Sequence, residues 1–254
     1  MRPWPNQTWK VIEVEGPVPS LYCLAVVRPG YELDIMQESL LRAPASRNDL
    51  GIFACDDFDL FSASKLHVGT HHRAGDVWTW PFKQAYVGTS KDGTAGNAQL
   101  FIHLWDAVRS VGKYKWYEWT CKADPDAVII PTRLRSHLSS HTAHTPMYFT
   151  NCNAYPSNPA FLMMYGPLEV FSTEAIVKYF ATKSVCTHMN FWSWGEDVYM
   201  QECMRRLGVP GVYDANLVGN DGCGYKNCHE DWKASFHRFK SKYAWMECWD
   251  QAHR

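Results

Sequence analysis

The sequence has almost no surplus of charge of either sign and no long hydrophobic run. Its 254 residues carry 25 lysines and arginines against 26 aspartates and glutamates, a formal net charge of -1. Because a nucleic-acid-binding domain needs a strong positive footprint, nucleic acid is not an expected partner. The longest apolar runs, such as 21–27 and 126–131, are far shorter than the roughly 20 residues that cross a bilayer, so we expect no membrane span in this chain.

The sequence also lacks tightly paired cysteines and an apolar signal-peptide core near its first residue. Its nine cysteines stand mostly apart, and nine is many for a cytosolic enzyme of this size. We therefore expect disulfides and one unpaired thiol, with a connectivity that spacing does not determine. The sequon at Asn6 agrees with a secretory-pathway lumen, Golgi or endoplasmic reticulum, although a cytoplasmic location stays open.

Apolar runs alternate with segments of helical periodicity along most of the chain. The run 21–27 indicates a strand buried on both faces, and 31–42 repeats apolar residues at the spacing of one helical face. Further strands are expected at 51–55, 116–120, 127–130, 147–150 and 161–170, and further helices at 99–109, 132–138, after Ser172 and at 196–207. This alternation predicts a single α/β domain over 1–254, with a mainly parallel central sheet flanked by helices.

Two parts of the chain do not follow that alternation. Residues 1–20 are expected to form an irregular segment. Residues 62–96 are polar and rich in His, Gly, Ser and Thr, so we expect a long, partly ordered connection there.

The strongest local motif is Asp124-Pro125-Asp126, which lies between a strand-like segment and a buried apolar run. In extended backbone, residues two apart point to the same side, so both carboxylates can face one cation. Oxygen ligands of this kind suit Mn²⁺ or Mg²⁺, which would neutralise a diphosphate leaving group. The alternative is a simple turn or cap, but carboxylates that follow a strand of an α/β sheet lie where ligands bind.

A second acidic pair, Glu196 and Asp197, opens an expected helix. The helix dipole alone can explain acids at this place. However, Asp197 shares its face with the apolar residues of the helix, so its carboxylate points along the buried stripe and suits a general base. Trp192 and Trp194 lead directly into this pair and are the best candidates among 12 tryptophans for stacking on a sugar.

A third cluster lies near the C-terminus, where His237 and Lys240 stand in an aromatic setting. The imidazole of His237 could complete a metal shell, and Lys240 could meet phosphate, although a single histidine is often only a hydrogen-bonded side chain. A zinc site of Cys223, Cys228 and His229 with His237 is an alternative, but its spacing matches no common zinc finger.

Three motifs in this order, 119–126, 195–198 and Phe236-His237, resemble the inverting β1,3-glycosyltransferases, a family that includes the core-1 galactosyltransferases and the Fringe enzymes. The segment 165–172 is similar to the glycine-rich strand that precedes a Ser-capped helix in that family. The resemblance implies a GT-A (Rossmann-like) fold. It also implies metal-dependent, inverting transfer of a sugar from a UDP-sugar to a glycan, glycoprotein or small-molecule acceptor.

The resemblance also implies roles for single residues. Asp126 and His237 would bind Mn²⁺ (or Mg²⁺), with Asp124 beside the ion and in contact with the nucleotide ribose or the donor sugar. Asp197 would take the proton from the acceptor hydroxyl. Asp57, at the end of the second expected strand, is placed where the family holds the uridine.

Glu196, Gly166 and the two tryptophans are expected beside the donor and acceptor sugars, and Lys240 beside the nucleotide. The sequence departs from the family at Pro125, where the family has a middle acid, and at Arg238, where a smaller or ring residue commonly follows the histidine. An amino-terminal anchor of the kind typical of Golgi enzymes is not seen. A retaining transferase of the same fold and a sugar-binding protein without catalysis are the alternative functions.

Overall fold

The computed structural model describes residues 18–46, 49–91, 93–153, 162–223 and 227–253. Within them, an eight-stranded sheet has the order β11-β9-β10-β7-β1-β2-β4-β3. Its strands are β1 (Leu21–Val26), β2 (Asp57–Ser62), β3 (His67–His71), β4 (Gly75–Pro81), β7 (Trp119–Ala123), β9 (Tyr148–Thr150), β10 (Leu168–Ser172) and β11 (Gly211–Tyr213). The α-helices are α1 (Tyr31–Ser46), α2 (Ala98–Val111), α3 (Pro131–Leu138), α4 (Thr173–Thr182), α5 (Glu196–Arg206) and α6 (Lys242–Ala252).

The sheet is mixed, with parallel pairs at its centre. β1 pairs in parallel with both β2 and β7, and β2 with β4, whereas β10 runs antiparallel to β7 and to β9. Shorter elements complete the fold: β5 (Gly88–Thr89), β6 (Ala95–Gly96), β8 (Ala127–Ile129), β12 (Val218–Gly219), β13 (Ser235–His237) and the 3-10 helices η1 (Gly51–Ala54), η2 (Lys113–Trp116) and η3 (Lys183–Val185). The predicted α/β class is confirmed.

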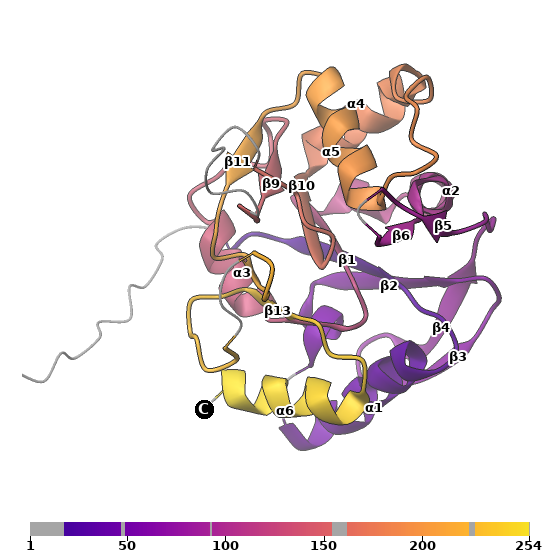
Figure 1. Ribbon diagram of the computed structural model, residues 1–254. Helices are drawn as coiled ribbons and strands as arrows, with labels where there is room; N and C mark the ends of the chain where they lie inside the picture. Colours follow the sequence, from indigo (N-terminus) through magenta and orange to yellow (C-terminus); the bar gives the residue numbers. More distant parts are fainter. Residues whose placement is uncertain (1–17, 47–48, 92, 154–161, 224–226, 254) are drawn as a thin grey trace, which may run out of the picture.

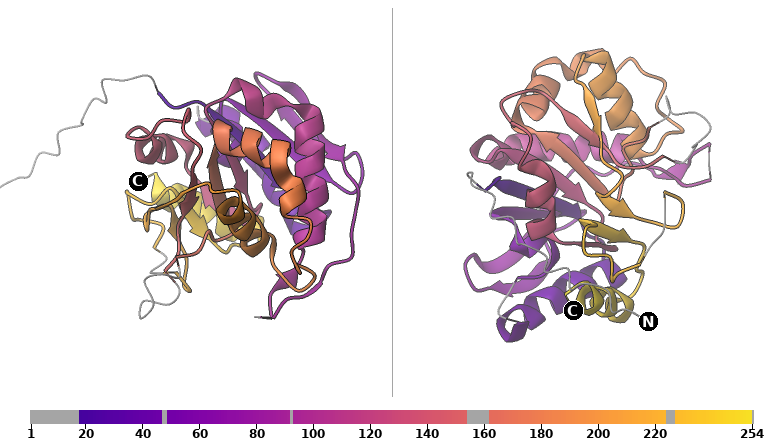
Figure 2. Two further views of the ribbon diagram at one scale, coloured as in Figure 1. Left: turned by 90° about the horizontal axis from the view of Figure 1, so that it is seen from above. Right: turned by 90° about the vertical axis from the view of Figure 1, so that its left-hand side faces the viewer.

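Helices cover both faces of the sheet. α1 and α6 lie on one face, and α2, α4 and α5 lie on the other (Figures 1 and 2). The strand β1 shows the consequence. Leu21, Cys23 and Ala25 belong to the hydrophobic cluster on the α1 side, while Tyr22 and Leu24 belong to the cluster on the α2 side. Burial on both faces explains why this strand is a continuous apolar run in the sequence.

The apolar run 51–55 is not a strand, contrary to the prediction. It forms η1, where Gly51 has a φ of +57°, a left-handed backbone that does not fit a strand. The run is buried in the hydrophobic cluster on the α1 side, and Trp245 of α6 lies 3.2 Å from the position that a Cβ on Gly51 would take. A short apolar run cannot by itself distinguish a strand from another buried segment. Asp57 therefore opens the strand β2 and does not end a strand, contrary to the prediction.

The prediction of a loosely ordered connection at 62–96 is also wrong in part. β3 and β4 lie within it and extend the central sheet, and β5 pairs with β6 in a short hairpin. In β4 the buried Val77 and Thr79 alternate with exposed residues, which is the pattern of a half-buried strand. Ser62, His71 and Thr79 are buried, while other polar residues of β3 and β4, such as His67, Thr70 and Asp76, face solvent at the edge of the sheet.

Several predicted element ends are confirmed. The Ser172 hydroxyl accepts a hydrogen bond from the backbone N–H of Ala175 at 3.2 Å, as an N-cap should. Gly208, with a φ of +65°, follows α5. The strand expected at 116–120 begins three residues later, at Trp119, and α6 was not predicted. The start of the strand expected at 161–170 lies outside the described residues.

Four disulfides join eight of the nine cysteines. They are Cys23–Cys55, Cys152–Cys223, Cys186–Cys203 and Cys228–Cys248. Cys121 is a buried free thiol, so the expectation of disulfides and one unpaired cysteine is confirmed. Because Cys223 and Cys228 are disulfide-bonded, the alternative zinc site is wrong.

The remaining expectations concern the start of the chain and the membrane. Residues 18–20 have no regular structure, and the rest of the expected irregular segment, with Asn6, lies outside the described residues. In the described part of the chain, no helix has both the length and the hydropathy needed to span a bilayer.

Candidate active site

A cavity of about 340 Å³ lies at the carboxyl ends of β1 and β7, beside the first turn of α5. Seven residues singled out in the sequence line it: Asp124, Asp126, Gly166, Glu196, Asp197, His237 and Lys240. The cavity therefore collects side chains from segments that lie far apart in the sequence, at the place where ligands bind in open α/β sheets.

Three of these side chains form a cluster of metal-ligating type. Asp124, Asp126 and His237 each offer one ligand atom, and these atoms lie within 4.8 Å of one another. The pairing of β13 with β8 brings them together, because it sets His237 opposite Ala127, the residue after Asp126. His237 Nε2 then lies 3.5 Å from Asp126 Oδ1. Two carboxylates and an imidazole suit a divalent cation such as Mn²⁺ or Mg²⁺.

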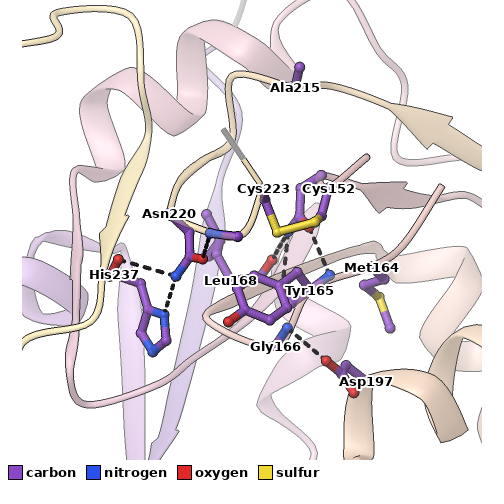
Figure 3. Close-up of a disulfide and its surroundings, with 12 residues drawn as sticks. Cys152, Met164, Tyr165, Gly166, Leu168, Asp197, Ala215, Asn220, Cys223 and His237 are labelled. Atoms are coloured by element: carbon purple, nitrogen blue, oxygen red, sulfur yellow. Dashed lines mark hydrogen bonds between the residues drawn. A yellow bond between two sulfur atoms is a disulfide. The ribbon is translucent and has the colours of Figure 1, made fainter. Parts of the chain in front are cut away.

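A second layer of contacts orients the imidazole of His237. Asn220 Nδ2 lies 2.8 Å from His237 Nδ1 and donates to the His237 carbonyl at 3.2 Å (Figure 3). The other ring nitrogen, Nε2, is left on the side of Asp126. The disulfide Cys152–Cys223 holds the turn that follows Asn220 against the segment around Tyr165 (Figure 3). Such outer contacts fix the ring orientation of a metal-binding histidine.

Lys122 connects the acidic groups of the cavity floor. This side chain is fully buried, and its Nζ donates to Asp124 Oδ1 at 2.7 Å and to Glu196 Oε1 at 3.0 Å. It also donates to the Gly166 carbonyl at 2.9 Å, and Glu169 Oε1 lies 3.4 Å away. One ammonium group therefore contacts groups on or next to β7, β10 and α5 and fixes the relative positions of these elements around the cavity.

The electrostatics follow from burial and from this lysine. Burial lowers the pKa of Lys122, but the charges of Asp124, Glu196 and Glu169 outweigh burial and hold that pKa above its usual range. Burial raises the pKa of Glu196, but Lys122 outweighs it and the pKa of Glu196 is lowered. Glu169 is deeper and less well paired, so burial raises its pKa to about 8. Its Oε1 has no hydrogen-bond partner in the described part of the chain.

Asp197 is the carboxylate with the properties of a base. Burial, together with the charge of Glu196, raises the pKa of Asp197 to about 7. Its Oδ2 accepts a hydrogen bond from the Gly166 N–H at 3.2 Å (Figure 3), and its Oδ1 accepts one from the Val198 N–H at 2.7 Å. A Cβ on Gly166 would lie 2.9 Å from Glu196 Oε1, which is too close. Glycine at this position therefore lets the carboxylates of Glu196 and Asp197 lie close to the backbone of residue 166.

Other predicted site residues lie elsewhere. Asp57 does not line this cavity: it opens β2, and its Oδ1 accepts from Lys113 Nζ at 2.9 Å while its Oδ2 accepts from the Tyr117 hydroxyl at 3.2 Å. Its placement beside a nucleotide depended on the wrong strand boundary. Trp192 is 74% exposed and Trp194 is half-buried against the core on the α2 side, and neither lines the cavity.

Lys122, Glu169 and Asn220 were not among the predicted site residues. Lys122 and Glu169 lie inside buried strands and are cross-strand partners in the pairing of β7 with β10. A charged residue inside an apolar strand was a visible signal, because such residues are almost never fully buried unless they are paired. Asn220 carried no comparable signal, since its role depends on the fold of the turn around it.

No protein-family model matches the chain. In sequence the chain resembles glycoprotein-N-acetylgalactosamine 3-beta-galactosyltransferase 1 of Xenopus laevis, to which it is 34% identical over 113 residues. The match covers 41% of this chain and 30% of the Xenopus protein, so it spans less than a third of that relative's length. The predicted resemblance to a β1,3-galactosyltransferase is confirmed over this part.

Two solved structures match almost the whole chain at low identity. One is a glycosyltransferase involved in the glycosylation of the major capsid of PBCV-1, with a TM-score of 0.47, 11% identity, and coverage of 91% of this chain and 99% of that chain. The other is the galactosyltransferase LgtC in complex with donor and acceptor sugar analogs, with a TM-score of 0.45, 8% identity, and coverage of 92% and 95%.

Proposed function

We propose that this chain is a metal-dependent glycosyltransferase that moves a sugar from a UDP-sugar to an acceptor hydroxyl with inversion at the anomeric carbon. One observation carries the proposal. The metal-ligating cluster Asp124, Asp126 and His237 shares a cavity with Asp197, a carboxylate whose pKa is raised to about 7. The partial likeness to a β1,3-galactosyltransferase supports the same conclusion.

In the proposed reaction, Asp197 accepts the proton of the acceptor hydroxyl as the hydroxyl oxygen bonds to the anomeric carbon. The bond from that carbon to the UDP oxygen breaks, and UDP leaves with the electron pair. Attack from the face opposite UDP inverts the configuration. Arg238 and Lys240 line the same cavity and offer positive charge to phosphate. A divalent cation at the Asp124, Asp126 and His237 cluster supplies neutralisation of the diphosphate charge when it is bound.

The acceptor in this proposal is a hydroxyl of a glycan, a glycoprotein or a small molecule. We place the chain in the lumen of the secretory pathway. Its four disulfides support that location, because disulfides form and persist in oxidising compartments.

Thermal unfolding with ligands tests the proposal. A ligand that binds only the native state stabilises it by about 2.7 kcal/mol at 100 times its Kd, so UDP with Mn²⁺ should raise the Tm clearly. In Asp126→Ala the part of the increase that depends on Mn²⁺ should disappear. An unchanged Tm at saturating UDP and Mn²⁺ would count decisively against a UDP-sugar transferase.

Activity assays then separate the alternatives. A screen of UDP-sugars with Mn²⁺ for slow donor hydrolysis identifies the donor without knowledge of the acceptor. NMR of the anomeric proton of the product distinguishes inversion from retention. If the chain binds sugars but turns over no UDP-sugar, it is a sugar-binding protein and the proposed activity is wrong.

A further inference from the structure

A second cavity, of about 420 Å³, is lined by residues of β2 and β4. These strands lie near the edge of the central sheet that β3 forms (Figure 1). None of the described residues lines both this cavity and the candidate active site. Trp78 and Trp80 of β4 line it and are 44% and 48% exposed. Because residues two apart in a strand point to the same side, both indoles stand on one face of β4.

This face of β4 is more exposed than the neighbouring position on β2. Phe61 of β2 is in register with Trp80 and belongs to the buried cluster beneath α2. Phe61 is fully buried, yet Trp80, its neighbour in the sheet, is about half exposed. Large aromatic side chains that lie side by side and exposed in a concave site are typical of ligand-binding surfaces. Their apolar area is not buried by folding and remains available for contact with a ligand.

The Trp80 indole is held in place by a buried polar network. Its Nε1–H donates to Asp59 Oδ1 at 2.9 Å. Asp59 is 5% exposed and also accepts hydrogen bonds from the Tyr22 hydroxyl at 2.7 Å and from Lys113 Nζ at 3.1 Å. A ring fixed in this way loses little conformational freedom when a ligand stacks on it, which favours binding.

The rim of the cavity supplies hydrogen-bonding groups with little net charge. Lys65 Nζ lies 5.0 Å from the centroid of the Trp78 ring, and Asp76, exposed at the same rim, is bonded to the Thr70 hydroxyl at 2.9 Å. The lining contains three aspartates and two lysines, and Lys113 is already paired with two of the aspartates. A strongly charged ligand finds no excess of opposite charge here.

We propose that this groove is a second binding site that takes a neutral oligosaccharide. The apolar face of a pyranose ring stacks on the fixed indole of Trp80, and its hydroxyl groups bond to the carboxylate of Asp76 and the ammonium of Lys65. The site lies outside the catalytic cavity and does not depend on the proposed transfer reaction. The site would bind one part of a glycan while another part of the same glycan reacts in the active site, or it would retain the protein on a surface that carries glycans.

NMR of the protein labelled at the indole nitrogens tests the proposal, with lactose, maltotriose and chitotriose as probes. Saturating UDP and diamagnetic Mg²⁺ are present, so that the first cavity is occupied and does not compete. We expect at least one probe to shift the indole N–H signals of Trp78 and Trp80. Trp80→Ala should weaken that binding about three- to tenfold, the size of one aromatic contact.

Trp232→Ala is the matched control, because Trp232 is 55% exposed and lies outside the groove. It should leave saccharide binding unchanged, and the Tm of each variant establishes that it is folded. The proposal is overturned if none of the three probes shifts the two indoles, or if calorimetric titration finds the same saccharide affinity in the double variant Trp78→Ala/Trp80→Ala as in the wild type. Loss of binding in Trp232→Ala but not in Trp80→Ala would move the site elsewhere. None of these outcomes depends on UDP-sugar turnover.

Discussion

Two clusters of aspartates and lysine lie at opposite ends of the parallel strands, and they differ in how completely they are paired. At the amino end, Lys113 Nζ bonds to Asp57 and Asp59 at 2.9 and 3.1 Å. The hydroxyl groups of Tyr22 and Tyr117 donate to the remaining oxygens of these carboxylates. This cluster is closed: each negative oxygen has a donor, and the group stabilises the sheet.

At the carboxyl end the acids outnumber the cation that pairs with them. Lys122 contacts Asp124, Glu169 and Glu196, and Asp126 and Asp197 lie in the same cavity. Buried like charges destabilise a fold, and such surpluses concentrate at functional sites. The comparison teaches that acidic pairs in a sequence are not equivalent. A pair that meets a full set of donors is structural, and a pair that lacks donors is suited to bind a cation or accept a proton.

Among the substitutions that distinguish the two clusters, we expect the largest effect on turnover from replacing the proposed general base, Asp197. Asp197→Asn keeps the shape of the side chain but cannot accept a proton, so donor turnover should fall by about 10²–10⁴-fold, the usual contribution of a general base. Binding of UDP with Mn²⁺ should persist. Steady-state kinetics with the donor found by the hydrolysis screen, and a UDP titration, measure both.

Asp57→Asn is the matched variant in the closed cluster. We expect it to leave hydrolysis of the donor near the wild-type rate, because Asp57 lies outside the catalytic cavity. Equal losses of turnover in the two variants would show that the distinction between the clusters is wrong.

The next largest effect is expected on the free energy of unfolding when the lysine of each cluster is replaced. Lys122→Met removes the buried cation that Asp124, Glu169 and Glu196 share, and breaking a buried ion pair in this way costs about 3–5 kcal/mol. Lys113 is 25% exposed, and its partner Asp59 keeps two other donors. Lys113→Met should therefore cost only about 1–3 kcal/mol, the penalty of a polar group left unsatisfied. Urea unfolding of both variants tests the difference, and a larger loss in Lys113→Met would reverse it.

A smaller effect is expected from the residue that orients His237. Asn220→Ala removes the contact to His237 Nδ1 and should weaken Mn²⁺ binding about 10- to 100-fold, as for other partners of metal-bound histidines. Calorimetric titration of Mn²⁺ in the presence of UDP measures it. Asn227→Ala is the control, since among the described residues Asn227 bonds within its own turn, to the N–H groups of His229 and Glu230. Unchanged Mn²⁺ affinity in Asn220→Ala would argue against a metal bound at His237.

The comparison also explains what the sequence could and could not predict. The spacing of Asp124 and Asp126 and the helical face of Asp197 are local properties, so they could be read from the chain alone. The roles of Lys122 and Glu169 depend on the register of β7 with β10, which no local pattern specifies.

The prediction of a loosely ordered connection at 62–96, where the edge strands β3 and β4 lie, was wrong for a related reason. The polar residues of β3 and β4 resemble a loop when the burial of alternate residues is unknown. The error at Asp57 came from a short apolar run, because η1 and a buried strand have the same composition. Element type was predictable where the periodicity was long, and the partners of charged groups were not.

The smallest predicted effect is on the pH dependence of turnover. The pKa of Asp197 is raised to about 7 by burial and by the charge of Glu196, with Lys122 acting in the opposite direction. Only the deprotonated form accepts a proton, so the rate should rise with pH through this value. At pH 7 it should be about half of its plateau, and below that it should fall about tenfold per pH unit.

Glu169→Gln gives this prediction a control, because the charge of Asp197 is one of the causes that raise the pKa of Glu169 and the interaction between two charges is mutual. Burial raises the pKa of Glu169 to about 8, so below that pH the wild-type side chain is protonated and neutral like glutamine. The variant and the wild type should therefore share one pH–rate profile up to about pH 8. Above that pH the two profiles should separate, because the wild-type Glu169 ionises and its negative charge raises the pKa of Asp197. A difference between the two profiles at pH 6 would mean that Glu169 is charged there and that a second carboxylate shares the proton with Asp197.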